Sequence, residues 1–320
     1  MRAYIIRRLI MLVPTLFLVT IICFVTLRFI PGSVIDLMVA EMAEESGLGA
    51  ELTAEYLMHE LGMDRPVYVQ YGEWLGNIFR GDLGRSLWTD RTVLEELQKR
   101  FPVSLELGLI ALLAGALIAL PVGTISAVRQ DTGTDYGFRT GAIMAISVPT
   151  FWMGTMVIVY PSIWWGWSPQ VQYIPLVDNP IGNLAQFALP AVIQGAHMSG
   201  TLMRMMRTMM LEVLRQDYIR TAWAKGLKER TVVLRHALKN ALIPVISQFG
   251  LLIAFVVGAT VVIEQIFCLP GIGLLLIEAL NKRDYPVITG INLVVASFVL
   301  IVNLLIDLSY AYLDPRIHYK

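Results

Sequence analysis

The chain has 320 residues, of which 56% are apolar and only 16% are charged, and its mean hydropathy is +0.63. Soluble domains carry about 25% charged residues, so this composition excludes a water-soluble globular protein and predicts an all-α integral membrane protein. Lysines plus arginines equal aspartates plus glutamates, at 25 each, which does not fit a basic nucleic-acid-binding protein, and the two cysteines indicate no disulfide framework.

Six uncharged runs are long enough to cross a bilayer as helices, which requires about 20 residues each. The third span is taken from a longer uncharged run, 140–177, whose second half is broken by prolines and carries tryptophans typical of a membrane interface. The predicted spans are Leu9–Leu27, Leu107–Val128, Gly141–Ile163, Asn179–Met203, Asn240–Ile263 and Tyr285–Ile306.

Residues 1–30 combine an N-terminal tail with the first span. Three arginines precede this span, as they do in a secretory signal. However, no small-x-small cleavage site follows Leu27, and the apolar run is longer than that of a signal peptide. We therefore expect a transmembrane helix that is retained.

Residues 31–102 predict a small helical lobe outside the membrane. The stretch 28–106 is acidic, with 14 carboxylates against seven bases. Asp64-Arg65-Pro66 is typical of a helix start, and apolar residues then recur at three- and four-residue spacing from Val67 to Phe79. A second short helix is expected over Thr92–Arg100, ended by Pro102. A cap on the span ends and a docking surface for a partner fit the lobe equally well.

The rest of the chain, 103–320, is predicted to be a five-helix transmembrane core. In its fourth span, His197 and Met198 are weak candidates for a transport pathway, because polar residues in membranes are often functional and methionine surfaces adapt to varied ligands. The residue types alone favour simpler interpretations. A histidine bonded to a neighbouring backbone carbonyl and methionines that fill gaps between helices explain the same pattern. Further methionines crowd this region: Met203, Met205, Met206, Met209 and Met210.

The loop between the fourth and fifth spans, about 204–240, carries nine bases and three acids. A short helix is expected there, stopped by Gly226 and followed by a second helix from Lys228 to Lys239. The residues that fall on one helical face are Leu214, Tyr218, Thr221 and Ala222. The helix could lie on anionic lipid or dock in a cleft of a cytoplasmic protein, and physical chemistry alone favours lipid.

A turn follows the fifth span. Its glycines permit close backbone approach, so the turn could shape an outer gate or a re-entrant segment, which a membrane tolerates only where it is buried in protein or lines water. The candidates for this outer mouth are Glu264, Phe267, Pro270, Gly271 and Gly273.

The distribution of lysine and arginine predicts the orientation. With the N-terminus in the cytoplasm, the inside segments carry 16 of these bases, whereas the two short outside loops carry only Lys282 and Arg283. Both termini are therefore expected to be cytoplasmic.

Catalytic motifs do not occur in the sequence. The dipeptide Gly-Lys of a Walker A motif is missing, His59-Glu60 has no second histidine four residues on, and the four histidines are scattered. We expect no enzymatic activity, no metal site and no cofactor in this chain.

Several longer stretches carry a resemblance. The inside loop reads DYIRTAWAKGL at 217–227 and RHALKNALIP at 235–244, and other stretches read LGMDRP at 61–66, RGDLGRS at 80–86, SVPTFW at 147–152, PGIG at 270–273, RDYP at 283–286 and DPR at 314–316. Together they resemble ABC-importer permeases, in particular the first permease of the pair in the dipeptide, oligopeptide and nickel transport family. The loop departs from the general importer pattern, which has E-A-A before its glycine where this chain has Arg220-Thr221-Ala222.

The resemblance implies a six-helix subunit of the type I importer kind in a bacterial or archaeal cytoplasmic membrane. It would form the pathway with a homologous second permease. Two cytoplasmic ATPase subunits, which bind ATP and magnesium, would drive it, and an extracytoplasmic binding protein would deliver peptides or similar small solutes. The resemblance also favours ATPase docking over lipid binding for the inside loop. It assigns coupling to Leu214, Asp217, Tyr218, Thr221, Ala222, Lys225 and Gly226.

Two rival functions remain at this point. A secondary transporter would need no ATPase, but the sequence shows no inverted repeat of broken short spans and few ionisable residues in the spans for ion coupling. A membrane-bound assembly or receptor subunit would not transport at all. The cargo stays open between dipeptides, longer peptides, nickel chelates and other solutes.

Overall fold

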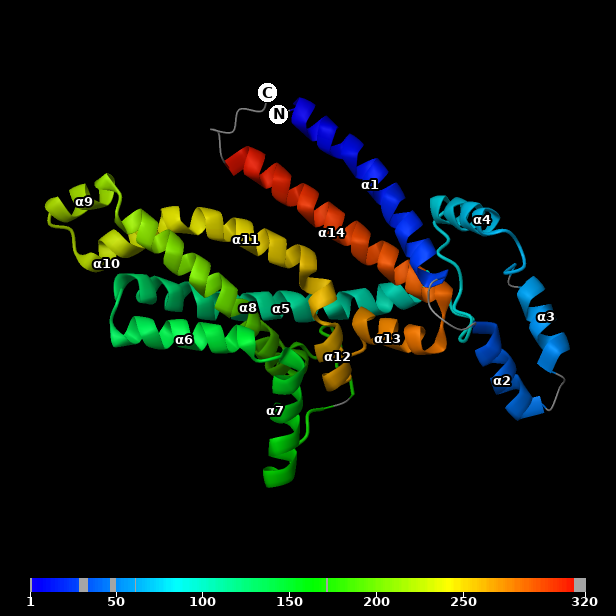
Figure 1. Ribbon diagram of the computed structural model, residues 1–320. Helices are drawn as coiled ribbons and strands as arrows, with labels where there is room; N and C mark the ends of the chain where they lie inside the picture. The colour runs from blue at the N-terminus through cyan, green and yellow to red at the C-terminus, as the bar shows by residue number, and fades with distance from the viewer. Residues whose placement is uncertain (1, 29–33, 47–49, 61, 171, 314–320) are drawn as a thin grey trace. The chain divides into compact units, whose positions relative to one another are not determined.

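The computed structural model describes residues 2–28, 34–46, 50–60, 62–170 and 172–313 (Figure 1). Over these ranges the chain is helical, and an isolated bridge between Arg85 and Thr92 is the one pairing of extended residues, which confirms the predicted all-α class. The chain forms two compact units. Unit 1 comprises Met1–Phe101, Leu274–Leu304 and Ala311–Lys320, and unit 2 comprises Pro102–Gly273 and Leu305–Tyr310.

Unit 1 contains α1 (Arg2–Arg28), α2 (Val34–Ser46), α3 (Ala50–Glu60), α4 (Val67–Phe79) and most of α13 (Ile272–Lys282) and α14 (Tyr285–Leu313). Helix α5 (Val93–Val128) begins in unit 1 and continues in unit 2. Unit 2 also contains α6 (Gly133–Ser147), α7 (Thr150–Trp165), α8 (Pro180–Leu214), α9 (Asp217–Ala224), α10 (Glu229–Thr231), the π-helical segment η1 (Val232–Ala237), α11 (Leu238–Ala259) and α12 (Val261–Phe267).

Helix α4 confirms the prediction made from its apolar spacing. Its N-cap is Pro66, and Gly81 takes a left-handed conformation just past its end. Aromatic side chains of α4 pack on α1, because the ring of Tyr71 lies 5.2 Å from that of Phe24 and its hydroxyl lies 2.8 Å from the hydroxyl of Thr20. The lobe is therefore tied to the first span.

Two of the quoted sequence motifs meet in unit 1, although they lie 198 residues apart. The hydroxyl of Ser86 donates to Asp284, and the backbone N–H of Leu87 donates to the other oxygen of the same carboxylate at 3.2 Å. The indole N–H of Trp88 donates to the carbonyl of Lys282 at 2.9 Å. These bonds join the end of the first motif to the start of the second. The motif at 314–316 and the segment 29–33 lie outside the described residues.

Helix α5 shows that one predicted helix end is wrong. Pro102 does not end the helix but lies inside it, as does Pro121. A proline removes one backbone donor, and a helix can continue when its neighbours restore the lost contacts. Here Val103 and Leu107 are buried just beyond Pro102, so packing holds the helix together.

The third predicted span, Gly141–Ile163, is not one helix. The chain bends by 91° between α6 and α7. The cause lies in Val148 and Pro149: a residue before proline is driven out of the helical region, and Val148 has φ −80° and ψ 122°. Figure 1 shows α7 leaving the direction of α6 at this point.

The described helices give four to six candidate spans, and the predicted count of six lies at the upper end of this range. Among the described residues, four helices are long and apolar enough to cross a membrane alone: α1, α5, the stretch Glu229–Ala254 that contains most of α11, and α14. The pairs α6 with α7 and α12 with α13 are long and apolar enough only when each bent pair is counted as one span. The described residues therefore contain four to six candidate spans. The fourth predicted span lies in α8, which is continuous but is not among these candidates. Its hydropathy is lowered by four polar residues: Asn183, Gln186, Gln194 and His197.

Helix α8 is the central helix of unit 2 and packs against both α6 and α11. The crossings are close. An added Cβ at Gly195 would lie 2.5 Å from the carbonyl oxygen of Ala111 in α5, and one at Gly200 would lie 2.6 Å from that of Ala142 in α6. Small residues at such crossings are typical of helices packed within membranes.

Candidate functional site

The segment between α8 and α11 contains a short helix with a defined end. Gly226, just past α9, has φ +76°, and its N–H donates to the carbonyl of Trp223 at 2.9 Å. The N–H of Leu227 donates to the carbonyl of Ala222 at 3.4 Å. These two bonds form a Schellman motif, which confirms the predicted helix stop at Gly226.

One face of α9 is anchored in the protein. Ile219 is fully buried and Ala222 is 6% exposed. Both belong to an apolar cluster with Met206 and Met210 of α8 and Val232 of η1. A displacement of α9 would therefore have to move the ends of α8 and α11, because these side chains share one core.

The aromatic side chains that flank this buried face of α9 are available for contact. The exposed fractions of Tyr218 and Trp223 are 43% and 46%, and Lys225 is also exposed. The side-chain amide of Asn240 donates to the Tyr218 hydroxyl at 2.7 Å, which holds this ring against the start of α11. Exposed tyrosine and tryptophan beside basic residues are typical of the residues that dominate protein interfaces.

The structure divides the predicted coupling residues between two helices. Leu214 is the last residue of α8 and is partly buried, while Asp217 begins α9. The prediction that Tyr218, Thr221 and Ala222 share a face with Leu214 is wrong, because the break after Leu214 resets the helical phase. Ala222 is buried, whereas the other members of the set after Leu214 are exposed.

Sequence reasoning missed two residues of this segment. Ile219 is the apolar anchor of α9, and Trp223 is its exposed aromatic contact. Both are large apolar residues, four positions apart, in the stretch 217–226, where most other residues are small, polar or charged. That signal was available, but the break between α8 and α9 was not visible in the spacing alone.

A buried ion pair ties three helices together close to α9. The guanidinium of Arg207 in α8 donates to both oxygens of Asp135 in α6, at 2.8 and 2.7 Å, and the hydroxyl of Ser126 in α5 donates to the same carboxylate. Asp135 is fully buried, and the Arg207 side chain is 17% exposed. Bidentate pairs fix orientation as well as distance, so the ends of these three helices that carry the ion pair are held in one arrangement.

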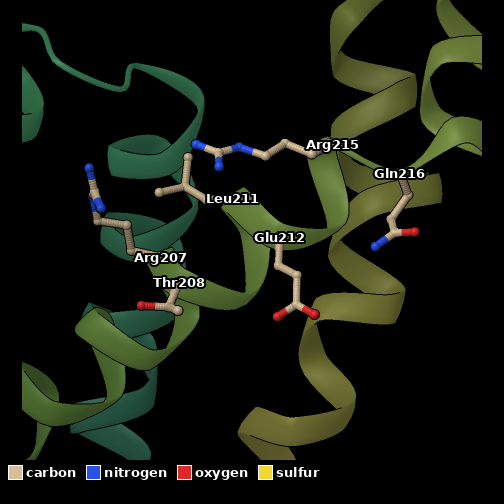
Figure 2. A pocket seen from close by; sticks show the side chains of 6 residues that line it. All are labelled: Arg207, Thr208, Leu211, Glu212, Arg215 and Gln216. Carbon is tan, nitrogen blue, oxygen red and sulfur yellow. The ribbon is translucent and has the colours of Figure 1, made fainter.

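Beside this ion pair, the last turns of α8 form an open groove of about 510 Å³. Figure 2 shows Arg207, Leu211 and Arg215 reaching to one side of the helix, while Glu212 and Gln216 point elsewhere. The last residue that lines the groove, Gln216, is the N-cap of α9. The groove adds basic side chains to the surface that α9 offers.

The methionines of α8 belong mainly to the protein interior. Met203, Met206 and Met210 are at most 2% exposed and lie in apolar clusters. Met198 is 7% exposed. His197 is half-buried, and its Nδ1 is buried without a hydrogen-bond partner among the described residues. Gap filling between helices thus accounts for these methionines.

The turn after the fifth predicted span is held by a buried carboxylate. Glu264 is fully buried. One of its oxygens accepts the N–H of Gly273 at 2.7 Å, and the other lies 2.6 Å from the hydroxyl of Thr260. The hydroxyl of Ser104 accepts the N–H of Ile272 at 2.8 Å. Glu264 therefore caps the start of α13, where a negative charge is favoured.

The other residues predicted at this outer mouth gather around the same carboxylate. An added Cβ at Gly271 would lie 2.3 Å from the Glu264 carboxyl carbon, and one at Gly273 would lie 2.8 Å from Oε2 of Glu264. Phe267 is 5% exposed, and Pro270 is half-buried. The described geometry of these residues is that of a packed turn.

Neither region brings together metal ligands. Within the ranges that the structure describes, no three histidine, cysteine, aspartate or glutamate side chains are grouped as they would be around a metal ion. The arrangement presents a contact surface on α9, and the buried side of α9 packs in one apolar cluster with α8, η1 and α11.

Comparison with known proteins gives one consistent result. Residues 119–319 match the family described as "Binding-protein-dependent transport system inner membrane component", and residues 1–108 match its N-terminal counterpart. The chain is 40% identical over 323 residues to the oligopeptide transport system permease protein AppB of Bacillus subtilis (strain 168), and 37% identical over 343 residues to the dipeptide transport system permease protein DppB of Escherichia coli (strain K12). Each match covers 100% of both chains.

A solved structure shows the same fold at low sequence similarity. It is titled "Crystal structure of an amino acid ABC transporter with histidines". The TM-score is 0.54 at 11% identity, and the match covers 69% of this chain and 95% of that one.

Proposed function

The chain belongs to the family of inner membrane components of binding-protein-dependent transport systems, and from this we propose that it is the permease subunit of an ATP-driven peptide importer. It is a multi-pass membrane protein and, as a permease, carries no catalysis of its own. The observation that supports the role most directly is α9, a short helix that carries two exposed aromatic side chains and is joined through one apolar core to the ends of α8 and α11.

The proposal requires partners. A homologous second permease would complete the pathway, two cytoplasmic ATPase subunits would bind ATP and magnesium, and an extracytoplasmic binding protein would deliver the cargo. ATP-driven closure of the ATPases would displace α9, and the core that it shares with α8 and η1 would carry that displacement into the helices. Such an equilibrium shifts only when a partner binds two states with different affinity, and ATP binding supplies that difference.

Peptides are the cargo class that we propose. The relatives named above are dipeptide and oligopeptide permeases, and they match over their full length. The proposed acidic lobe at 31–102 would lie outside the membrane and contact the binding protein, with the core at 103–320 forming the pathway.

Co-purification tests this role. When the tagged chain is extracted in mild detergent from its native host, we expect the second permease and the ATPase subunits to accompany it in about equal amounts. A chain that purifies alone and takes up solute in vesicles under an ion gradient would instead be a secondary transporter.

The proposed orientation gives a second prediction. With Cys23→Ala and Cys268→Asn as background, a cysteine at Tyr68 should react with an impermeant thiol reagent added outside intact cells, because this residue is 77% exposed on α4 in the outer lobe. A cysteine at Glu229 should react only after permeabilisation. Asparagine suits position 268 because the backbone there is left-handed, with φ +53°. Outside labelling at position 229 would reverse the orientation.

A further inference from the structure

Helix α6 lies outside the apolar cluster that contains Ile219 and Ala222 of α9, the α9 cluster. Among the described residues, the α9 cluster takes its members from α5, α8, α9, η1 and α11. Helix α6 packs in a second cluster, in which Ala142 lies with Leu202 and Met203 of α8. Helices α5, α8 and α11 contribute to both clusters, so a displacement of α9 would reach α6 through them.

The first turn of α6 is fastened to two of these helices by the carboxylate of Asp135. This side chain is fully buried, and each of its oxygens accepts two hydrogen bonds. Oδ1 accepts from Nε of Arg207 at 2.8 Å and from the hydroxyl of Ser126. Oδ2 accepts from Nη2 of Arg207 at 2.7 Å and from the backbone N–H of Asp131 at 3.0 Å. These four bonds use the full accepting capacity of a carboxylate and fix its position.

Both side chains that bind Asp135 stand next to residues of the α9 cluster. Ser126 precedes Ala127 on α5, and Arg207 follows Met206 on α8. Ala127 and Met206 are at most 2% exposed and belong to the α9 cluster. The carboxylate therefore holds α5 and α8 at the level where these two helices also hold α9.

The contacts that α6 makes farther along are of a different kind. An added Cβ at Gly200 of α8 would lie 2.6 Å from the carbonyl oxygen of Ala142, so the two backbones approach closely there. Apolar packing is non-directional, and helices that meet through it can slide or rotate against each other. A bidentate ion pair fixes orientation. Stability alone does not account for this pair, because apolar side chains of similar volume often stabilise a core as well as a buried ion pair does.

We propose that Asp135 is a positioning residue for transport, which makes α6 follow α8 and α9 when the ATPases close. This inference rests on the proposed function and assigns one residue to the transmission of movement. Helix α6 leads through the bend at Val148 and Pro149 into α7, so the carboxylate would carry both helices. Without it, α8 would slide or rotate against α6, and ATP hydrolysis would continue with little uptake.

The first measurement is uptake of radiolabelled L-alanyl-L-alanine by the complete transporter in vesicles, divided by the ATP hydrolysed in the presence of the loaded binding protein. The central variant, Asp135→Asn with Arg207→Met, leaves no unpaired buried charge, so its complex should unfold at a temperature close to that of the unaltered complex. We expect its uptake per ATP to fall about tenfold, within the range that coupling between two sites normally covers, while stimulated hydrolysis stays within about twofold. Arg207→Lys keeps the charge but loses the bidentate geometry, so its uptake per ATP should be intermediate.

Asp131→Asn is the matched control. Asp131 is exposed in the turn before α6, and its carboxylate accepts from the side chain of Gln130 at 3.0 Å. Its backbone is left-handed, with φ +59°, a conformation that asparagine accepts. The substitution removes a carboxylate close to the ion pair but keeps the backbone N–H that donates to Asp135. We expect uptake per ATP to be unchanged.

A distance measurement tests the movement itself. With Cys23→Ala and Cys268→Asn as background, spin labels at Thr140→Cys in α6 and Arg204→Cys in α8 report the separation of two exposed positions. In the complex with the intact ion pair, we expect the same separation without nucleotide and with ATP. In the double variant the separation should change when ATP is added, because α8 then moves without α6.

Each contrary result overturns the proposal. Uptake per ATP at the unaltered level in the double variant would show that the pair only stabilises the fold; if the double variant does not assemble, the same result in Arg207→Lys decides. An equal loss in Asp131→Asn would point to a general charge effect. A separation that changes with ATP although the ion pair is intact would show that α6 does not follow α8. If the unaltered complex shows no ATP-driven uptake, the proposed function itself fails before any variant is compared.

Discussion

Replacing Gly226 with valine should abolish most cargo uptake while the chain still inserts and assembles. The φ of +76° at Gly226 is a conformation that a β-branched residue tolerates poorly, at a cost of about 1–3 kcal/mol. An added Cβ would meet no heavy atom within 4 Å, so the backbone alone causes the effect. We expect the Schellman motif to open and α9 to tilt. A bias of about 1.4 kcal/mol against the productive arrangement lowers uptake about tenfold.

Three control variants make this result interpretable. Gly226→Asn should retain most uptake, because asparagine accepts left-handed conformations. Gly226→Ala should fall between asparagine and valine. Lys225→Ala removes a neighbouring charge without straining the backbone and tests the lipid interpretation. Transport by Gly226→Val at the unaltered rate, together with loss of membrane association in Lys225→Ala, would contradict the coupling role of this segment.

Replacing Glu264 with alanine should destabilise the protein more than any surface substitution. The change leaves the buried N–H of Gly273 without its acceptor, which costs about 1–3 kcal/mol, and removes a negative charge from the start of α13, worth up to about 2 kcal/mol. It also opens a cavity next to Gly271. Thermal unfolding of the purified complex in detergent measures the loss.

The matched variant Glu264→Gln separates the role of the hydrogen bonds of Glu264 from the role of its negative charge. Its side-chain oxygen can accept from Gly273, and its amide can donate to the hydroxyl oxygen of Thr260, whose own hydrogen can go to the carbonyl of Val257 at 2.9 Å. We expect stability and uptake close to those of the unaltered protein. A stable Glu264→Gln complex without uptake would show that the charge itself acts during transport, which would contradict a purely structural role as the cap of α13.

The sequence predicts those features that depend on local chemistry. The apolar spacing of α4 and the helix stop at Gly226 follow from residues within one or two turns, so both are correct. The bend at Val148 and Pro149 and the continuation of α5 through Pro102 show the opposite case. A proline ends one helix and not the other, because packing around it decides whether the chain continues.

The candidate sites follow the same division. Their location was predictable, since the basic loop and the glycine-rich turn are marked by composition. The sequence did not predict which side chains of the basic loop are buried. The break between α8 and α9 shifts the helical phase, so Ile219 is buried and Tyr218 is exposed. Likewise, the ion pair between Asp135 and Arg207 joins α6 to α8. No spacing within either helix reports that contact.

The most direct test is ATP-driven uptake of a dipeptide into vesicles that contain this chain, the second permease, the ATPase subunits and the binding protein. We expect uptake only when all components and ATP are present, with loss of uptake when any one is omitted. Uptake that proceeds with this chain alone, follows an ion gradient and ignores ATP would contradict the assignment of the chain as the permease subunit of an ATP-driven importer.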